Sequence, residues 1–106
     1  METHTYKSGT NRGNRRIWIE GDRLTRNGIR RGVKFTREHI GTAQMVLTFS
    51  GEGRHTVAGT ADRPIIDLNG KYLNEFFGDA EGFRATFIPA ADNAAPQITI
   101  DVVETV

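Results

Sequence analysis

The fold is decided by the segment Ile17-Trp18-Ile19-Glu20-Gly21-Asp22-Arg23-Leu24, because a similar segment occurs 49 residues later. The second segment reads Ile66-Asp67-Leu68-Asn69-Gly70-Lys71-Tyr72-Leu73. In both segments apolar residues alternate with other residues up to a glycine, and a leucine follows three positions after that glycine. The alternation predicts a strand, and the residues after the glycine predict a short helix. We therefore expect the same strand-and-helix unit twice in the chain.

The residues that follow the first segment predict the rest of one unit. Asp22 suits the N-terminal end of the helix, and Gly28 is placed to end it in a left-handed conformation. Turn-forming residues near 39–42 and at 51–53 separate the next apolar stretches. The predicted elements are a strand over Arg16–Glu20, a helix of about two turns over Asp22–Asn27, paired strands over Val33–Arg37 and Gln44–Phe49, and a short strand over His55–Ala58.

The second segment is followed by a similar series. Gly82–Thr86 lies over Gly32–Thr36 after one extra residue, and a last strand over Gln97–Val103 corresponds to Gln44–Phe49. We expect a mostly β, α+β fold with two short helices, made of two βαββ units over about 15–60 and 61–106. One unit has too little apolar surface to close a core, so the two units are expected to cover each other within one domain, 15–106. Chance similarity between two simple βαββ patterns is the alternative.

The first fourteen residues lack any apolar periodicity. Met1–Asn14 is rich in threonine, serine, glycine and asparagine, and it also contains Lys7 and Arg12. This composition predicts a flexible basic arm. The six phenylalanines all fall within the predicted domain, where we expect them to pack in the core.

The glycine and apolar positions of the first unit resemble a known signature. Ile17-x-Ile19-x-Gly21-x-x-Leu24-x-x-x-Gly28-Ile29-x-x-Gly32 is similar to the core pattern of SymE-like proteins, a branch of the AbrB/MazE-type swapped-hairpin superfamily. In that fold the strand and helix of one half interleave with the hairpins of the other half. The resemblance implies a tandem, AbrB-like pseudo-dimer in one chain, or a homodimer. It also implies a DNA-binding regulator or antitoxin, or a SymE-like RNA-cleaving toxin.

The charges are divided unevenly along the chain. Residues 1–38 contain ten basic and four acidic residues, a net charge of +6, whereas residues 39–106 contain four basic and nine acidic residues, a net charge of −5. This division favours a polyanion such as double-stranded DNA, with RNA as a second possibility. Folding that intermixes the two halves is the alternative.

Arginine and lysine side chains form the candidate nucleic-acid site. The arginine fork bridges phosphate oxygens or the O6/N7 edge of guanine, and the resemblance places basic residues at the strand entrance and around the helix on DNA. A solvated face whose arginines pair with Glu20, Asp22 and Glu38 is the alternative. The candidate residues are Arg12, Arg15, Arg16, Arg23, Arg26, Arg30, Arg31 and Lys34.

The second unit lacks these bases and suggests a different partner. A protein that docks on its acidic surface is the rival hypothesis, for example in a DNA-mimic inhibitor of a host defence enzyme. Such a regulator, antitoxin or inhibitor is expected in a phage or other mobile element. The candidate docking residues are Tyr72, Glu75, Asp79 and Glu81.

Catalytic chemistry has little support in the sequence. His4, His39 and His55 are scattered without metal-site spacing, no nucleophile has an evident base, and we expect no catalytic residue, metal or cofactor. The chain has no cysteine and no apolar run of membrane length, which favours a cytoplasmic protein without a membrane partner. Trp18 is expected in the core or against a partner, with base stacking as the alternative.

Overall fold

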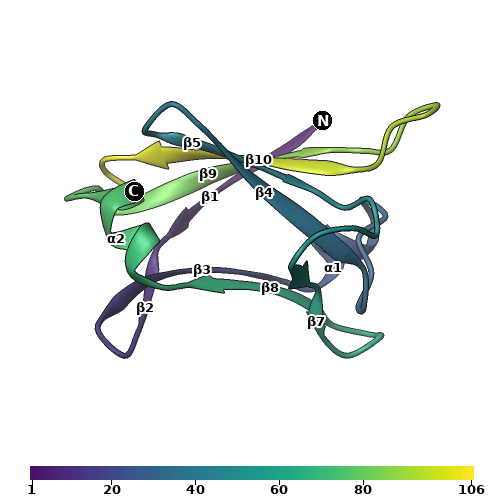
Figure 1. The fold of residues 1–106 in the computed structure, drawn as a ribbon, viewed down its shortest axis with the longest axis horizontal. Helices are drawn as coiled ribbons and strands as arrows, with labels where there is room; N and C mark the ends of the chain where they lie inside the picture. The colour runs from purple at the N-terminus through teal and green to yellow at the C-terminus, as the bar shows by residue number, and fades with distance from the viewer.

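Strands make up most of the ordered elements of the chain, which a computed structural model describes over residues 1–106 (Figure 1). This confirms the prediction of a mostly β fold with two short helices. The elements are β1 (Glu2–Lys7), β2 (Gly9–Asn11), β3 (Asn14–Glu20), α1 (Asp22–Thr25), β4 (Lys34–Ile40), β5 (Gln44–Thr48), β6 (His55–Thr56), β7 (Ala58–Gly59), β8 (Pro64–Asn69), α2 (Lys71–Phe77), β9 (Gly82–Ile88) and β10 (Gln97–Val103).

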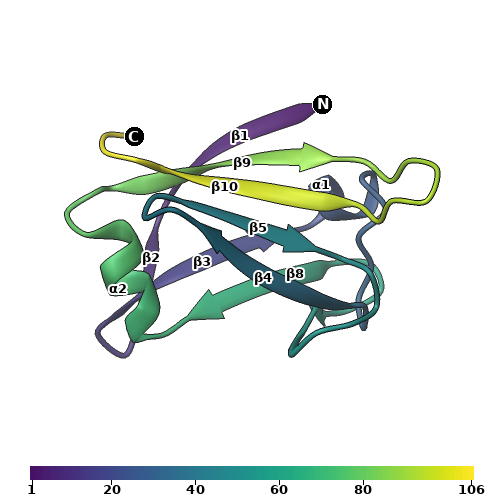
Figure 2. The ribbon, with the colours of Figure 1, turned by 45° about the horizontal axis from the view of Figure 1, so that its top comes forward.

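The strands form two antiparallel sheets that lie in two layers (Figures 1 and 2). One sheet has the order β1-β9-β10-β5-β4-β6, and the other has the order β2-β3-β8-β7. The helices α1 and α2 lie at opposite ends of the two-layered molecule. Alternate residues of β3, β5, β8, β9 and β10 are buried. Since successive side chains of a strand point to opposite faces, the buried ones lie between the two sheets and form the core.

Apolar side chains alone fill this core. Nineteen buried residues form one cluster, and no polar or charged residue is buried. All six phenylalanines are buried, as predicted. Ile17 and Ile19 of β3 are buried, whereas Trp18 between them is 37% exposed on the outer face, so Trp18 does not lie in the core.

The same order of elements occurs twice. We call β3-α1-β4-β5 the first unit and β8-α2-β9-β10 the second unit. The strands β3 and β8 pair so that Trp18 lies opposite Asp67, the residue 49 positions later. Each helix follows a glycine with positive φ, and Leu24 and Leu73 donate equivalent backbone hydrogen bonds to those glycines at 3.0 and 3.1 Å.

The strands β5 and β10 pair with the same kind of symmetry. Gln44 Nε2 donates to Asp101 at one end of the ladder at 2.8 Å, and Gln97 Nε2 donates to Thr48 at the other end at 3.1 Å. Gln44 and Gln97 are each the first residue of their strand. Equivalent strands of the two units therefore pair with each other in both sheets.

The N-terminal residues correct one expectation. Instead of a flexible arm over 1–14, β1 pairs with β9 from Glu2 opposite Phe87 to Lys7 opposite Gly82, and β2 pairs with β3. This strand has no apolar periodicity because its half-buried side chains are polar or aromatic: Glu2, His4 and Tyr6. The backbone edge of β9 holds this strand regardless of hydropathy.

The helix α1 is shorter than expected. It ends at Thr25 rather than Asn27, because the Asn27 side chain donates to the Arg23 carbonyl at 2.7 Å and so competes for a helical acceptor. Gly28 follows with φ of 81°, the left-handed conformation predicted for it. The predicted strand over 55–58 is divided into β6 and β7 at the buried Val57.

Candidate nucleic-acid interface

The predicted basic residues lie at both ends of β3. Arg12 and Arg15 lie at its beginning, in or beside the β2–β3 turn, whereas Arg23 and the residues after it follow its last residue, Glu20. Figure 1 shows the β2–β3 turn and α1 at opposite ends of the sheet. A strand of this length separates its ends by roughly 20 Å. The eight residues therefore do not form one compact patch.

Arg15 binds carbonyl and hydroxyl groups of its own chain. Its Nε donates to the Ser8 hydroxyl at 2.8 Å, its Nη1 donates to the Gly78 carbonyl at 3.1 Å, and its Nη2 donates to the Ala80 carbonyl. Its guanidinium carbon lies 4.7 Å from the centre of the Phe77 ring. Because all three nitrogens have acceptors, Arg15 joins the start of β3 to the end of α2.

Arg16 is also engaged within the chain. Its Nε and Nη2 donate to the two carboxylate oxygens of Asp67 at 2.8 Å each, and its guanidinium carbon lies 4.4 Å from the centre of the Trp18 ring. These hydrogen bonds lower the pKa of Asp67. Trp18 therefore carries an arginine on its face, which occupies the surface that a stacked base would use.

Arg23 and Arg26 face β1 across a polar surface. Arg23 Nη1 donates to the Tyr6 hydroxyl at 2.9 Å. Arg26 donates from Nε to Glu2 at 3.0 Å and from Nη2 to the second Glu2 oxygen. Hydrogen bonds from Arg26, then from His4 and Asn27, hold the pKa of Glu2 far below its usual range.

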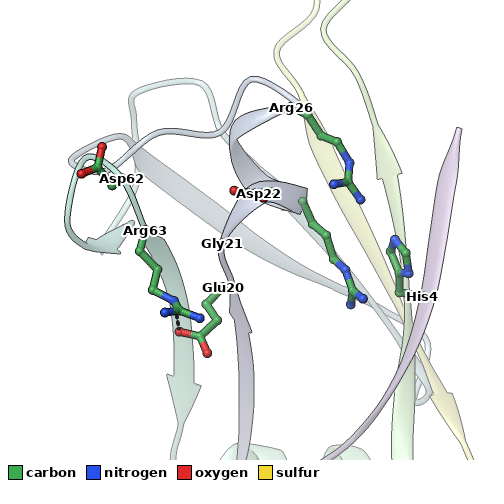
Figure 3. Close-up of a pocket in the computed structure, with 8 residues that line it drawn as sticks. His4, Glu20, Gly21, Asp22, Arg26, Asp62 and Arg63 are labelled. Carbon is green, nitrogen blue, oxygen red and sulfur yellow. Dashed lines mark ion pairs between the residues drawn. The ribbon is translucent and has the colours of Figure 1, made fainter.

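A polar hollow of about 710 Å³ lies beside these two arginines (Figure 3). Figure 3 shows Arg26 pointing toward the strand that carries His4. It also shows Arg63 pointing toward Glu20, and Arg63 Nε lies 3.1 Å from Glu20 Oε2. Three arginines and three carboxylates line the hollow, so its lining is nearly balanced in charge. The lining residues are His4, Glu20, Gly21, Asp22, Arg23, Arg26, Asp62 and Arg63.

The remaining predicted bases have no partner within the chain. Arg30, Arg31 and Lys34 are exposed and form neither an ion pair nor a side-chain hydrogen bond; the same is true of Arg12. Arg30 and Arg31 lie in the loop that leads into β4, and Lys34 is the first residue of that strand.

The fold adds Arg54 to this group, a residue that sequence reasoning missed. Gly51 donates its backbone N–H to the Lys34 carbonyl at 3.0 Å, and β6 pairs with the first two residues of β4. Arg54 lies between these contacts and is exposed. The Gly51–Gly53 turn before a predicted strand was the available signal. We call Arg30, Arg31, Lys34 and Arg54 the basic end; Glu52 is the acidic residue within the same turn.

Three of the four candidate docking residues line two adjoining hollows, because Glu75 borders both. Glu75 and Asp79 line an acidic hollow of about 590 Å³ together with Glu104 and the apolar residues Phe76 and Phe77. Tyr72 lines a neighbouring hollow with His39, and the Arg37 guanidinium carbon lies 3.7 Å from the Tyr72 ring centre. Glu81 accepts a hydrogen bond from the Val106 N–H at 2.9 Å.

The histidines lie apart from one another. His4 lies beside Glu2, His39 contacts Tyr72, and His55 stacks on Phe35. Burial and the charge of Arg37 lower the pKa of both His39 and His55. No three His, Asp or Glu side chains are grouped as metal ligands, and neither helix has the length and apolar character of a membrane span.

Comparison with known proteins returned no match: no family model, no curated protein and no solved structure matches the chain.

Proposed function

We propose that the chain is a small nucleic-acid-binding protein that binds double-stranded DNA through the basic end. We further propose that its two units form a tandem AbrB-like swapped-hairpin pseudo-dimer. The pairing of β3 with β8 and of β5 with β10 supports this arrangement, because equivalent elements of the two units interleave. Regulation of transcription or antitoxin activity is the corresponding role.

The observation that carries the proposal is the group of unpartnered cations at the basic end. Arg15 and Arg16 already have acceptors in their own chain, whereas Arg30, Arg31, Lys34 and Arg54 have none. Exposed cations without partners can neutralise phosphates and release counterions, which supplies most of the affinity of non-specific DNA binding.

The test compares two triple variants with the same change in net charge. Arg30→Ala, Arg31→Ala and Lys34→Ala together remove three bases of the basic end. Lys7→Ala, Lys71→Ala and Arg84→Ala together remove three exposed bases elsewhere that have no side-chain partner. Affinity for a fluorescent 20-base-pair duplex is measured by anisotropy over a series of salt concentrations.

We expect the first variant to bind far more weakly than the wild type. The slope of log affinity against log salt should fall by about 0.9 per lost phosphate contact. The control variant should keep most of the slope. Equal losses in both variants would show an effect of overall charge alone and would contradict this interface. Single-stranded DNA and RNA probes in the same assay decide between duplex binding and the RNA-directed alternative.

The acidic hollow favours a second candidate function, docking of a basic protein surface. Three carboxylates, from Glu75, Asp79 and Glu104, line it without a basic residue. Phe76 and Phe77 add apolar surface to the same hollow. A chain that binds none of the three nucleic acids would favour this candidate.

A further inference from the structure

The six-stranded sheet ends with β1 on one side and with β4 and the short β6 on the other. β4 pairs with β5 along Thr36–Ile40, but on its other side β6 pairs only with Lys34 and Phe35. The segment Thr36–Ile40 therefore has a strand on one side only, and we call it the open edge. Figure 2 shows β4 on the side of the sheet opposite β1. Unpaired backbone groups of this kind are a template for an added strand.

The chain itself fills the equivalent edge in the second unit. The pairings place Phe35 of β4 and Phe83 of β9 at equivalent positions, since each is the second residue of its hairpin strand and both are buried. This corrects the sequence alignment of Gly82–Thr86 with Gly32–Thr36 by two residues. Beside Phe83, Tyr6 of β1 stacks at 5.0 Å; beside Phe35, His55 of β6 stacks at 5.2 Å. β6 is thus the counterpart of the last two residues of β1.

The counterpart of the rest of β1 is missing. β1 continues from Tyr6 back to Glu2 along β9, whereas the chain before His55 turns away at Gly53. This turn requires glycine, because Gly53 has φ of 118° and a Cβ there would lie 2.2 Å from the Phe35 carbonyl oxygen. The open edge is therefore the length of strand that pairs with β1 in the second unit and that no strand pairs with in the first.

The charges around the open edge define what would fit it. In the covered edge, Glu2 lies opposite Phe87 and accepts hydrogen bonds from Arg26 of α1. The residue of α2 that is 49 positions after Arg26 is Glu75, which lines a hollow of about 260 Å³ with His39. A strand residue opposite His39 would therefore face a carboxylate instead of a guanidinium. A lysine or arginine fits there, and the Glu2 of a second copy does not.

Two residues along the added strand, the next side chain that faces the core is expected to be acidic instead of basic. A strand residue opposite Arg37 would take the place that His4 takes opposite Ala85 in the covered edge. Arg37 has a buried Nε without a hydrogen-bond partner. An acceptor such as a glutamate side chain fits this position.

We propose that the open edge of β4 binds an extended peptide segment of another protein as an additional antiparallel strand, with a basic residue opposite His39 and an acidic residue opposite Arg37. Backbone hydrogen bonds supply the affinity and the two inward side chains supply the selectivity, as in other cases of strand addition. The proposal depends neither on DNA binding by the basic end nor on docking at the acidic hollow.

The test uses two blocked pentapeptides of identical composition. Acetyl-Thr-Lys-Thr-Glu-Thr-amide places lysine opposite His39 and glutamate opposite Arg37, and acetyl-Thr-Glu-Thr-Lys-Thr-amide reverses them. Each is titrated to several millimolar, at low salt, into the ¹⁵N-labelled full chain. We expect the amide resonances of 36–40 to shift and the first peptide to bind about tenfold tighter. Its lysine faces Glu75 and its glutamate faces Arg37, whereas the second peptide places like charges at both positions.

Two controls separate strand addition from simple charge attraction. Backbone N-methylation of the first peptide should abolish binding, since the methyl groups remove the donors but keep the side chains. Glu75→Lys, an exposed position, should remove the preference for the first peptide while the protein stays folded by its NMR spectrum. The proposal fails if the amides of 36–40 do not shift, if the two peptides bind equally, if the N-methylated peptide binds, or if the preference survives Glu75→Lys. It also fails if sedimentation shows a dimer whose dissociation shifts these same amides, since the occupant is then a second copy.

Discussion

Trp18 and Asp67 lie directly opposite each other in the β3–β8 ladder, and they are the same position of the two units. Arg16 joins them, because its guanidinium binds the Asp67 carboxylate and lies on the Trp18 ring. The backbone of the two units is thus symmetric at its centre while the side chains are not. The same asymmetry occurs at other positions 49 residues apart, since Arg26 and Arg30 of the first unit correspond to Glu75 and Asp79 of the second.

The Arg16–Asp67 pair predicts a dependence of stability on pH. Hydrogen bonds from Arg16 lower the pKa of Asp67 in the folded chain. A lowered pKa contributes stability that is present above the unfolded pKa, about 3.9, and is lost as pH falls through the folded pKa. We expect Asp67→Asn to lower Tm near neutral pH. Between about pH 5 and pH 2, the Tm of this variant should decrease less than the Tm of the wild type. Thermal scans by circular dichroism measure this, with the exposed Asp92→Asn as control. An unchanged pH profile would contradict the pairing.

The two units also predict matched packing energies. Leu24 and Leu73 occupy the same position after the two glycines, and both are fully buried. Truncation of a buried leucine to alanine costs about 2–5 kcal/mol of unfolding free energy. We expect Leu24→Ala and Leu73→Ala each to fall within that range in urea titrations. A cost below about 1 kcal/mol for either variant would show that its helix does not pack on the core as described.

The sequence predicted the strands with alternating apolar residues and missed β1 and β2. β10 lies over the predicted residues 97–103, and β3 and β5 lie within two residues of their predicted bounds. These strands bury one face, so hydropathy marks them. β1 is held by backbone pairing with β9, and its side chains have no apolar alternation that would predict a strand.

The candidate site was less predictable than the fold. Charge alone does not distinguish Arg15, which satisfies three carbonyl and hydroxyl acceptors of its own chain, from Arg30, which has no partner. That distinction depends on contacts between residues more than sixty positions apart, such as Arg15 with Gly78. The addition of Arg54 depends on the turn that returns the chain to β4.

The pairing of the units predicts that a half chain will not fold alone. A fragment of residues 1–60 keeps β3 and β5 but loses β8 and β10, the strands that pair with them, and β1 loses β9. We expect the fragment to be unfolded or to associate with a second copy, because each unit leaves its core face open. Size-exclusion chromatography and thermal circular dichroism measure this. A cooperative transition in a monomeric fragment would contradict it.

Arg23 and Arg26 should behave differently from the basic end. Both bind β1, through Tyr6 and Glu2. We therefore expect Arg23→Ala with Arg26→Ala to lower Tm by loosening β1, and to change the salt slope of DNA binding less than the triple variant of the basic end. The anisotropy titrations provide the comparison, with hydrogen exchange of the β1 amides as the readout of loosening. A full loss of the salt slope with an unchanged Tm would place these two arginines in the main contact instead.

The two helices carry opposite charges at one pair of equivalent positions. Glu75 of α2 lies 49 positions after Arg26 of α1, but the open edge beside it has no counterpart of Glu2. A lysine at 75 is therefore an exposed base without a partner, unlike Arg26. A new phosphate contact raises duplex affinity and steepens the salt slope by about 0.9. We expect Glu75→Lys to do both, and Asp92→Lys, an exposed reversal in the β9–β10 loop, to raise affinity less because it lies outside the two equivalent helical surfaces. Anisotropy over a salt series measures both variants. Equal effects would mean that DNA responds only to net charge, and a loss of affinity in a folded Glu75→Lys chain would contradict the equivalence of the two surfaces.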